Sequence, residues 1–295
     1  MKIKFLFTLV LACVTWPALA QDKAEPDPPI PALPNFTKED PHVYGRQLAE
    51  YAELYDTGWK DEILKGQMTL FDASGDSVTR SFARMVYEHR EKGAGDKIII
   101  KFLKPAELAG VAALTFENPG SSDDNWLWLP ASKRTRRIAG ANNTASFQGT
   151  EFTYEDLGSI DPSEYVWRFV EETTLKRGKD RVPVYKLSAT PTYKDTGYSR
   201  IVLYVHREHW RHERIEYYDK AGRLLKTRKA SDWKLFHNRF WRAMRLDMSN
   251  HQTGKRTLLD ISGQQVSLHR HTHPKTGKPR SNLSEDIFTT RALTR

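Results

Sequence analysis

The sequence predicts an α+β protein that is mainly antiparallel β: an open (half) β-barrel of about eleven strands, with short helices capping an apolar cavity. Three observations predict this class. Strand-like segments separated by turn sequences follow one another over most of the chain. No stretch alternates strands with long helices, which argues against a parallel sheet. Several strands are also apolar on both faces.

One amphipathic helix is expected near the start of the folded body. Asp40 suits an N-cap before Pro41 at the first helical position, and apolar side chains then recur at helical spacing as far as Tyr55. The next residues, Asp-Thr-Gly, should end the helix. Two further short helices are expected, at residues 149–157 and 285–293.

The expected strands alternate or are apolar throughout, and turn sequences such as Gly-Ala-Gly-Asp and Lys-Ala-Gly-Arg separate them. They are expected at residues 68–72, 78–89, 97–103, 111–116, 126–129, 165–175, 182–189, 199–206, 214–218, 224–233 and 242–248.

Apolar residues on both faces of a strand require cover on both faces or an enclosed space. Residues 98–100 and 201–205 are apolar at successive positions, which places such side chains on either side of the sheet. The expected helices are too few and too short to cover so wide a sheet. The pattern therefore favours a sheet curled around an apolar cavity, with a plain β-sandwich core as the alternative.

The first twenty residues have the pattern of a cleaved signal peptide. Lys2 and Lys4 precede an apolar run over residues 5–16 and a small-x-small site at residues 18–20. An uncleaved anchor is less favoured because a membrane span needs about 20 apolar residues, and so is a form lipid-anchored through Cys13. Cys13 is the only cysteine, so the mature protein is expected to be a cysteine-free protein of the periplasm.

Beyond the signal peptide, residues 21–40 are rich in proline and are expected to form an extended tether, followed by a single domain over residues 41–295. The formal net charge is +9, and removing Lys2 and Lys4 leaves +7. This charge suits transient contact with anionic lipid headgroups or an acidic protein partner. A well-solvated surface explains it equally well, and no nucleic acid partner is expected outside the cytosol.

Several blocks of the sequence resemble a known family. They are residues 124–138 (DNWLWLPASKRTRRI), 147–157 (FQGTEFTYEDL), 182–187 (VPVYKL), 217–222 (YYDKAG) and 286–288 (DIF). From about residue 41 onward the chain resembles the outer-membrane lipoprotein-sorting proteins, which are related to the periplasmic carriers LolA and LolB and to the sensor domains of anti-sigma regulators.

The resemblance implies a half-barrel of about eleven antiparallel strands, with helices on its concave side and an apolar cavity for lipid or lipoprotein acyl chains. It also implies an association with inner-membrane exporters of the resistance-nodulation-division type. The chain is longer than LolA and lacks a match to the arginine-centred motif by which LolA retains cargo. The function expected is a periplasmic carrier, with an envelope sensor that binds a partner protein as the alternative.

The residues expected to line the cavity or its lid are aromatic. Trp126 alternates with Trp128 in one strand and Trp167 with Phe169 in another, while the resemblance places Phe152 and Tyr154 near the lid. On general grounds, such residues more often belong to an ordinary core, which is the alternative for each of them. A basic run is the candidate for membrane or partner contact, with a solvated hairpin tip as the alternative; it comprises Lys133, Arg134, Arg136 and Arg137.

The sequence gives little support for a metal site or for an enzyme active site. His206, His209 and His212 are spaced three apart, and His269, His271 and His273 alternate, but neighbouring arginines disfavour a cation, so surface histidines without a metal are expected. The chain has no Gly-x-Ser-x-Gly, His-Glu-x-x-His or phosphate-binding glycine loop. Neither a catalytic residue nor a cofactor is predicted.

Overall fold

The structure is a computed structural model that describes residues 28–89, 94–138, 140–268, 271–272, 279–280 and 283–294. The expected signal peptide, the first part of the expected tether and Cys13 lie outside the described residues.

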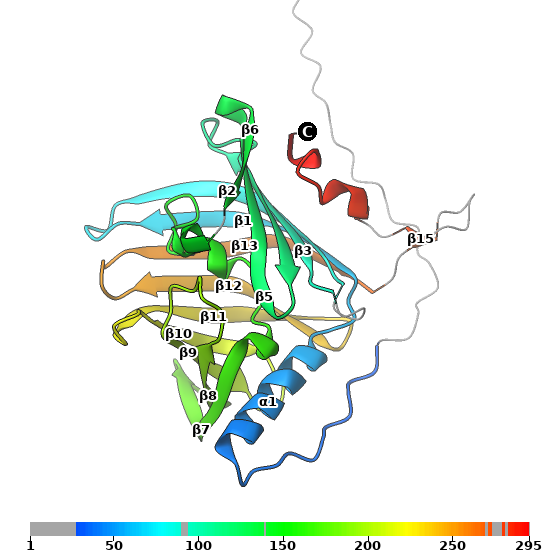
Figure 1. Cartoon of the computed structure of the whole chain (residues 1–295), viewed down its shortest axis with the longest axis vertical. Helices are drawn as coiled ribbons and strands as arrows, with labels where there is room; N and C mark the ends of the chain where they lie inside the picture. Colours follow the sequence, from blue (N-terminus) through cyan, green and yellow to red (C-terminus); the bar gives the residue numbers. More distant parts are fainter. Residues whose placement is uncertain are drawn as a thin grey trace, which may run out of the picture.

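One antiparallel sheet of 13 strands forms the body of the protein (Figure 1). The sheet is open, and the half-barrel predicted from the sequence is confirmed. Its strands are β1 (Asp61–Phe71), β2 (Ser77–Tyr87), β3 (Lys97–Lys104), β4 (Ala112–Asn118), β5 (Ser121–Leu129), β6 (Arg134–Ile138), β7 (Tyr165–Arg177), β8 (Asp180–Pro191), β9 (Arg200–His206), β10 (His212–Tyr218), β11 (Leu224–Phe236), β12 (Phe240–Asn250) and β13 (Arg256–Ser267). A separate two-stranded ribbon comprises β14 (His271–Thr272) and β15 (Pro279–Arg280).

The first strand, β1, lies in the middle of the sheet, and the later strands are added first on one side of it and then on the other. Strands β1 to β6 run from the middle to one edge, and the chain then crosses to the other edge and returns through β7 to β13. Strand β13 pairs with β1, so Met68 lies opposite Leu259. Strands β6 and β7 are the two edges and do not pair with each other, which leaves the barrel open.

Helix α1 (Pro41–Tyr55) packs on the concave side of the sheet against β7 (Figure 1). The side chain of Asp40 accepts hydrogen bonds from the first backbone N–H groups, as expected for an N-cap. The helix approaches β7 closely at Gly45, where a Cβ atom would lie 2.4 Å from the backbone nitrogen of Phe169. A glycine is therefore required at this contact.

The two other expected helices are short 3₁₀ turns instead. Residues 149–157 contain only η4 (Tyr154–Asp156), because Thr153 and Asp156 form a capping box around a single turn. At the C-terminal end, residues 285–293 give η6 (Glu285–Ile287) and η7 (Ala292–Thr294). The remaining turns are η2 (Pro130–Ser132), η3 (Gly140–Thr144) and η5 (Pro162–Glu164).

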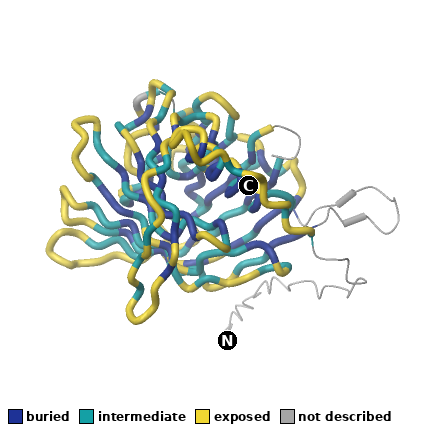
Figure 2. The backbone as a smooth tube through the Cα atoms, turned by 90° about the horizontal axis from the view of Figure 1, so that it is seen from below, coloured by how far each residue is buried: buried dark blue, intermediate teal, exposed yellow. Residues whose placement is uncertain are grey.

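Both apolar faces of the sheet are partly covered by other segments of the chain. Ile98 and Ile100 point to the main core between the concave face and α1, whereas Ile99 points to a second cluster on the convex face. Phe288 and the rest of the segment 283–294 cover that second cluster. Figure 2 shows that buried residues lie along the strands and that exposed residues lie at the turns. The expectation that two-sided apolar strands require a cavity is thus only partly correct.

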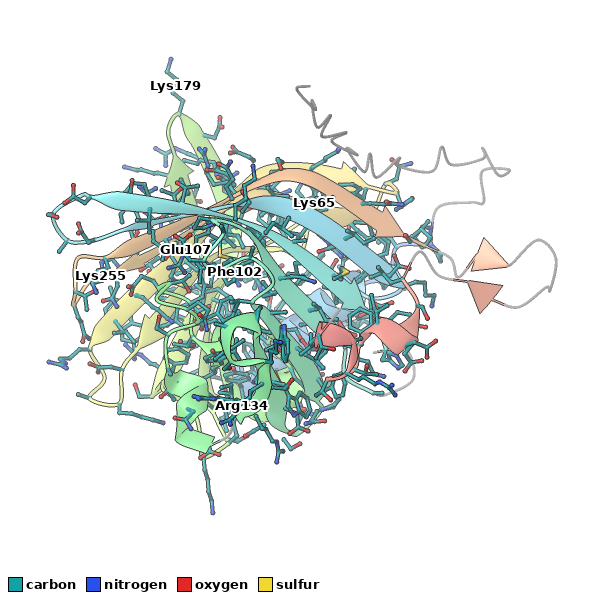
Figure 3. The ribbon with its side chains drawn as sticks, turned by 90° about the horizontal axis from the view of Figure 1, so that it is seen from above. Lys65, Phe102, Glu107, Arg134, Lys179 and Lys255 are labelled. Atoms are coloured by element: carbon teal, nitrogen blue, oxygen red, sulfur yellow. The ribbon has the colours of Figure 1, made fainter. Side chains whose placement is uncertain are left out.

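The ends of the hairpins are solvated. The side chain of Lys179, between β7 and β8, extends away from the body, whereas the side chain of Phe102 is fully buried (Figure 3). Within the described residues, no helix has the length and apolar character needed to cross a membrane.

Candidate functional site

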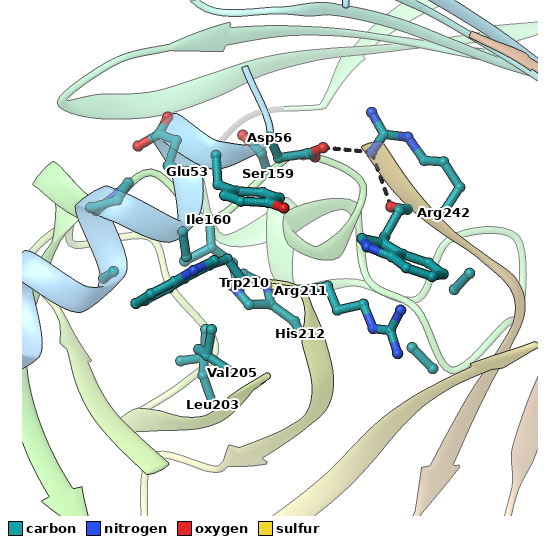
Figure 4. Close-up of a pocket in the computed structure, with 18 of the residues that line it drawn as sticks. Glu53, Asp56, Ser159, Ile160, Leu203, Val205, Trp210, Arg211, His212 and Arg242 are labelled. Carbon is teal, nitrogen blue, oxygen red and sulfur yellow. Dashed lines mark hydrogen bonds and ion pairs between the residues drawn. The ribbon is translucent and has the colours of Figure 1, made fainter. Parts of the chain in front are cut away.

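A cavity of about 300 Å³ lies between α1 and the concave face of the sheet. One wall is apolar, and Figure 4 shows Ile160, Leu203, Val205 and Trp210 on it. Helix α1 contributes small side chains here, which leaves space between helix and sheet. The apolar lining residues include Ala49, Ala52, Ile160, Trp167, Leu187, Leu203, Val205 and Trp210.

The opposite wall is charged, so the lining is more polar than the sequence predicted. Arg242 is bound by two carboxylates, with Nη1 2.6 Å from Asp56 and Nε 2.6 Å from Glu62. Arg84 also reaches Glu62, at 3.4 Å. These ion pairs join the end of α1 and β1 to β12, and they give the buried Arg242 and Glu62 partners of opposite charge.

An aromatic stack lines the cavity beside these ion pairs. The guanidinium of Arg211 lies 4.4 Å from the ring centres of both Trp233 and Trp241, and its Nε donates to Glu213. His209 also contacts Trp241, with ring centres 4.8 Å apart. The planar guanidinium and the rings gain cation–π contacts, which hold this part of the wall rigid.

Two smaller cavities adjoin the main one and are rich in carboxyl groups, and tyrosines also line one of them. Burial raises the pKa of Asp123 to about 7, with a further contribution from the nearby Glu117. Burial likewise raises the pKa of Glu164 to about 8, and Asp123 and Asp161 add to the shift. Glu164 is therefore mostly protonated at neutral pH, whereas Asp123 titrates there.

Residues 145–157, here called the inner loop, close the concave face between β3 and β11. Phe147 stacks on Phe102 of β3, with ring centres 5.6 Å apart. On the other side of the loop, Asp156 accepts a hydrogen bond from Lys226 of β11. The inner loop is therefore held at both ends by buried contacts.

Comparisons with known proteins agree with this architecture. The chain is 34% identical to a domain from Vibrio parahaemolyticus assigned as an outer membrane lipoprotein-sorting protein; the match covers 85% of this chain and 98% of that domain, with a TM-score of 0.75. A family model described as an uncharacterized protein matches residues 94–295. The chain belongs to the outer membrane lipoprotein-sorting protein family.

Two further structures are similar to this family member. A DUF1329 family protein from Desulfovibrio piger is 28% identical over 86% of this chain and 99% of that one, with a TM-score of 0.74. A LolA superfamily protein from Nitrosomonas europaea is 17% identical over 84% and 98% of the two chains, with a TM-score of 0.60, which shows a shared fold. A comparison with curated proteins found no match.

Of the aromatic residues predicted to line the cavity of this lipoprotein-sorting family member, only Trp167 does so. Phe169 packs instead on Tyr44 of α1, with ring centres 4.7 Å apart. Phe152 and Tyr154 are buried in the main core as part of the inner loop and do not reach the cavity wall.

Trp126 and Trp128 lie on the convex face of the sheet, in the second cluster beneath the C-terminal segment. Their alternation in β5 does place them on one face, as expected, but that face is turned away from the cavity. Leu127, between them, points to the main core. A single strand does not reveal which of its faces is concave.

The predicted basic run forms β6 and the turn before it. Lys133 adopts a left-handed conformation (φ 49°) in that turn, and the strand that follows is the edge of the sheet. Arg137 forms an ion pair with Asp124 of β5, while Arg134 and Arg136 are exposed. The run is thus an exposed, positively charged edge strand rather than a hairpin tip alone.

In the first histidine group, His206 is not the surface residue that was expected, while His209 and His212 are partly exposed. His206 is buried and stacks on His209, with ring centres 4.4 Å apart. Burial lowers the pKa of His206 to about 4, and His209 and Arg211 add to the shift. In the described part of the chain, no group of three or more potential ligands could hold a metal ion; His269 and His273 lie outside that part.

Sequence reasoning missed most of the cavity wall. The charged and stacked residues come from two regions that are far apart in the chain: the end of α1 with β1 and β2, and the turn before β10 with β11 and β12. A signal was present in the tryptophans, because Trp59, Trp210, Trp233 and Trp241 also line the cavity. Each stands alone in its segment, so no local pattern connects them.

Proposed function

We propose that this protein is a periplasmic carrier that holds an acyl chain of a lipid or lipoprotein beneath α1 and moves it across the cell envelope. The proposal is one of binding without bond-making. The observation that supports it is the cavity of about 300 Å³ with an apolar wall on the concave face of the half-barrel. The shared fold with a LolA superfamily protein agrees with it.

The size of the cavity limits what it holds. A volume of 300 Å³ is at the lower end of the range for small-molecule sites. At about 30 Å³ for a water-sized group, it takes about ten methylenes, which is one acyl chain. At about 0.8 kcal/mol per buried methylene, such a chain gains about 8 kcal/mol, equivalent to a Kd of about 1 μM before ordering costs.

The rest of the proposed setting follows from the sequence. Cleavage after residue 20 would release the protein into the periplasm. Part of the expected tether packs on the folded body instead, because the carbonyl oxygens of Pro29 and Pro31 accept hydrogen bonds from Arg239 and Tyr51. The exposed basic strand β6 would meet anionic headgroups or an acidic partner while cargo is transferred. An exporter of the resistance-nodulation-division type remains the proposed inner-membrane partner.

The test is displacement of a fluorescent fatty-acyl probe. Ala52→Trp places an indole in the cavity from α1 and should weaken probe binding at least tenfold. Leu54→Trp is the matched control, because Leu54 is 52% exposed on the same helix, and it should bind as the wild type does. If the wild-type protein binds no acyl probe, or if both variants bind equally, the carrier proposal is wrong.

A second measurement addresses the cargo. Native mass spectrometry of protein purified from the periplasm should reveal a co-purified lipid that the Ala52→Trp variant lacks. Protein that never carries a lipid would instead favour the alternative, an envelope sensor that binds a partner protein.

A further inference from the structure

We propose that the preferred ligand is an anionic single-chain amphiphile, whose oxyanion binds the guanidinium of Arg228 while its acyl chain lies on the apolar wall. This inference rests on the proposed carrier function and specifies its ligand class. It identifies a binding residue for the headgroup, on β11, that neither the family resemblance nor the aromatic pattern of the sequence indicates.

The cations of the cavity wall differ in whether they have partners. Arg242 is bound by Asp56 and Glu62, and Arg84 reaches Glu62 as well. Arg211 donates to Glu213. Within the described residues, Arg228 has neither a hydrogen bond nor an ion pair, although it lines the same cavity.

The cross-strand neighbours of Arg228 are apolar, whereas the adjoining cavity that it also lines contains carboxyl groups. In the sheet it lies between Ile215 of β10 and Met248 of β12, both fully buried. Arg228 itself is partly buried and lines both the main cavity and one adjoining cavity. Two residues earlier on the same face, Lys226 is paired with Asp156. Arg228 is thus a cation on the concave face whose donors are open to the cavity.

The acids of the main cavity wall do not supply the missing partner. Asp56 and Glu62 hold Arg242, and Glu117 accepts the backbone N–H of Ser159 at 2.6 Å. The guanidinium of Arg228 is only partly buried and lines the cavity. A ligand that brings an oxyanion would therefore gain charge-assisted hydrogen bonds there without displacing a protein partner.

The chemistry of the guanidinium selects the headgroup. Its planar donors match the oxygens of a carboxylate or a phosphate, and both form charge-assisted hydrogen bonds. A neutral glycerol ester offers only weaker acceptors. Fatty acids and lysophospholipids share the required features, namely one acyl chain that the cavity can hold and an oxyanion at its end.

The experiment compares ligands with the same dodecanoyl chain, below their micellar concentrations, by calorimetry on the intact protein. Laurate carries a carboxylate, lauroyl lysophosphatidic acid carries a phosphate, and monolaurin is neutral. The wild type should bind at least one anionic ligand about tenfold more tightly than monolaurin, as expected for a charge-assisted hydrogen bond. If laurate binds more tightly than lauroyl lysophosphatidic acid, the site prefers fatty acids; the reverse order means that it prefers phospholipids.

Arg228→Met should remove this preference, so that the anionic ligands bind no more tightly than monolaurin. Lys229→Met is the matched control: it removes the same charge from the neighbouring, exposed position of β11 and should keep the preference. Urea unfolding should show that both variants fold.

Equal binding of all three ligands by the wild type would overturn the role of Arg228, and so would a preference that survives in Arg228→Met. In either case the carrier proposal stands. If none of the three ligands binds, the carrier proposal itself fails.

Discussion

The ammonium nitrogen of Lys226 lies 2.5 Å from Oδ2 of Asp156, and both side chains are almost completely buried. The pair joins β11 to the inner loop. Lys226 also donates to the backbone oxygen of Glu151 at 3.0 Å, and Asp156 accepts hydrogen bonds from the Thr153 N–H and the Tyr198 hydroxyl. A buried pair of this kind fixes the position of the loop over the concave face.

Lys226→Met should therefore destabilise the protein strongly. It leaves the Asp156 carboxylate buried without its cation, which costs about 3–5 kcal/mol. The free energy of unfolding, measured in urea, should fall by that amount. The double variant with Asp156→Asn should recover much of the loss, because the uncompensated charge is then absent. A cost below 1 kcal/mol for Lys226→Met would contradict the structural role of the pair.

Gly45→Ala tests the close contact between α1 and β7. At an ordinary helical position this change stabilises by about 1 kcal/mol. Here the new Cβ would lie 2.4 Å from the backbone nitrogen of Phe169 and 2.6 Å from the carbonyl carbon of Arg168. Because backbone atoms cannot move aside easily, we expect a loss of about 1–3 kcal/mol by urea unfolding. Arg46→Ala, on the exposed face, should change stability by less than about 0.5 kcal/mol.

Phe288→Ala tests the cover over the convex face. Phe288 is 1% exposed and packs against the second cluster, where Tyr87 lies 5.9 Å away between ring centres. Truncating a buried phenylalanine costs about 3–5 kcal/mol, enough to release the C-terminal segment. We expect stronger binding of an apolar dye and faster hydrogen exchange in β4 and β5. The exposed Arg291→Ala should do neither, and acyl-probe binding should be retained in both.

Glu164→Gln tests the buried carboxyls through the pH dependence of stability. The folded pKa of Glu164 is raised to about 8, whereas an unfolded glutamate titrates near 4.3. Between these values the folded state holds the proton and the unfolded state does not. The contribution to stability is therefore complete below about pH 4 and is lost as the pH rises to about 8.

Unfolding midpoints in urea at pH 5, 6.5 and 8 check this expectation. The wild type should lose more stability over that range than Glu164→Gln, which has no proton to lose. Glu107→Gln, at an exposed position (Figure 3), should follow the wild-type profile. A Glu164→Gln profile parallel to that of the wild type would mean that Glu164 is ionised throughout.

The amino-acid pattern alone predicted the helix near residues 41–55, eleven of the strands of the main sheet and their antiparallel arrangement, because these depend on spacing along the chain. It missed β6, whose residues are mostly charged, and β13, which follows a turn sequence without a long apolar run. Edge position and pairing with β1 are what make these two segments strands.

The sequence by itself determined that the strands would be apolar on both faces, since side chains alternate along any strand. Only the tertiary structure decided which face is concave. The direction in which the sheet curls turned Trp167 into the cavity and Trp126 beneath the C-terminal segment. Likewise, the register of β11 against β10 and β12 places Arg228 between Ile215 and Met248, and the spacing of residues along β11 alone does not give that register.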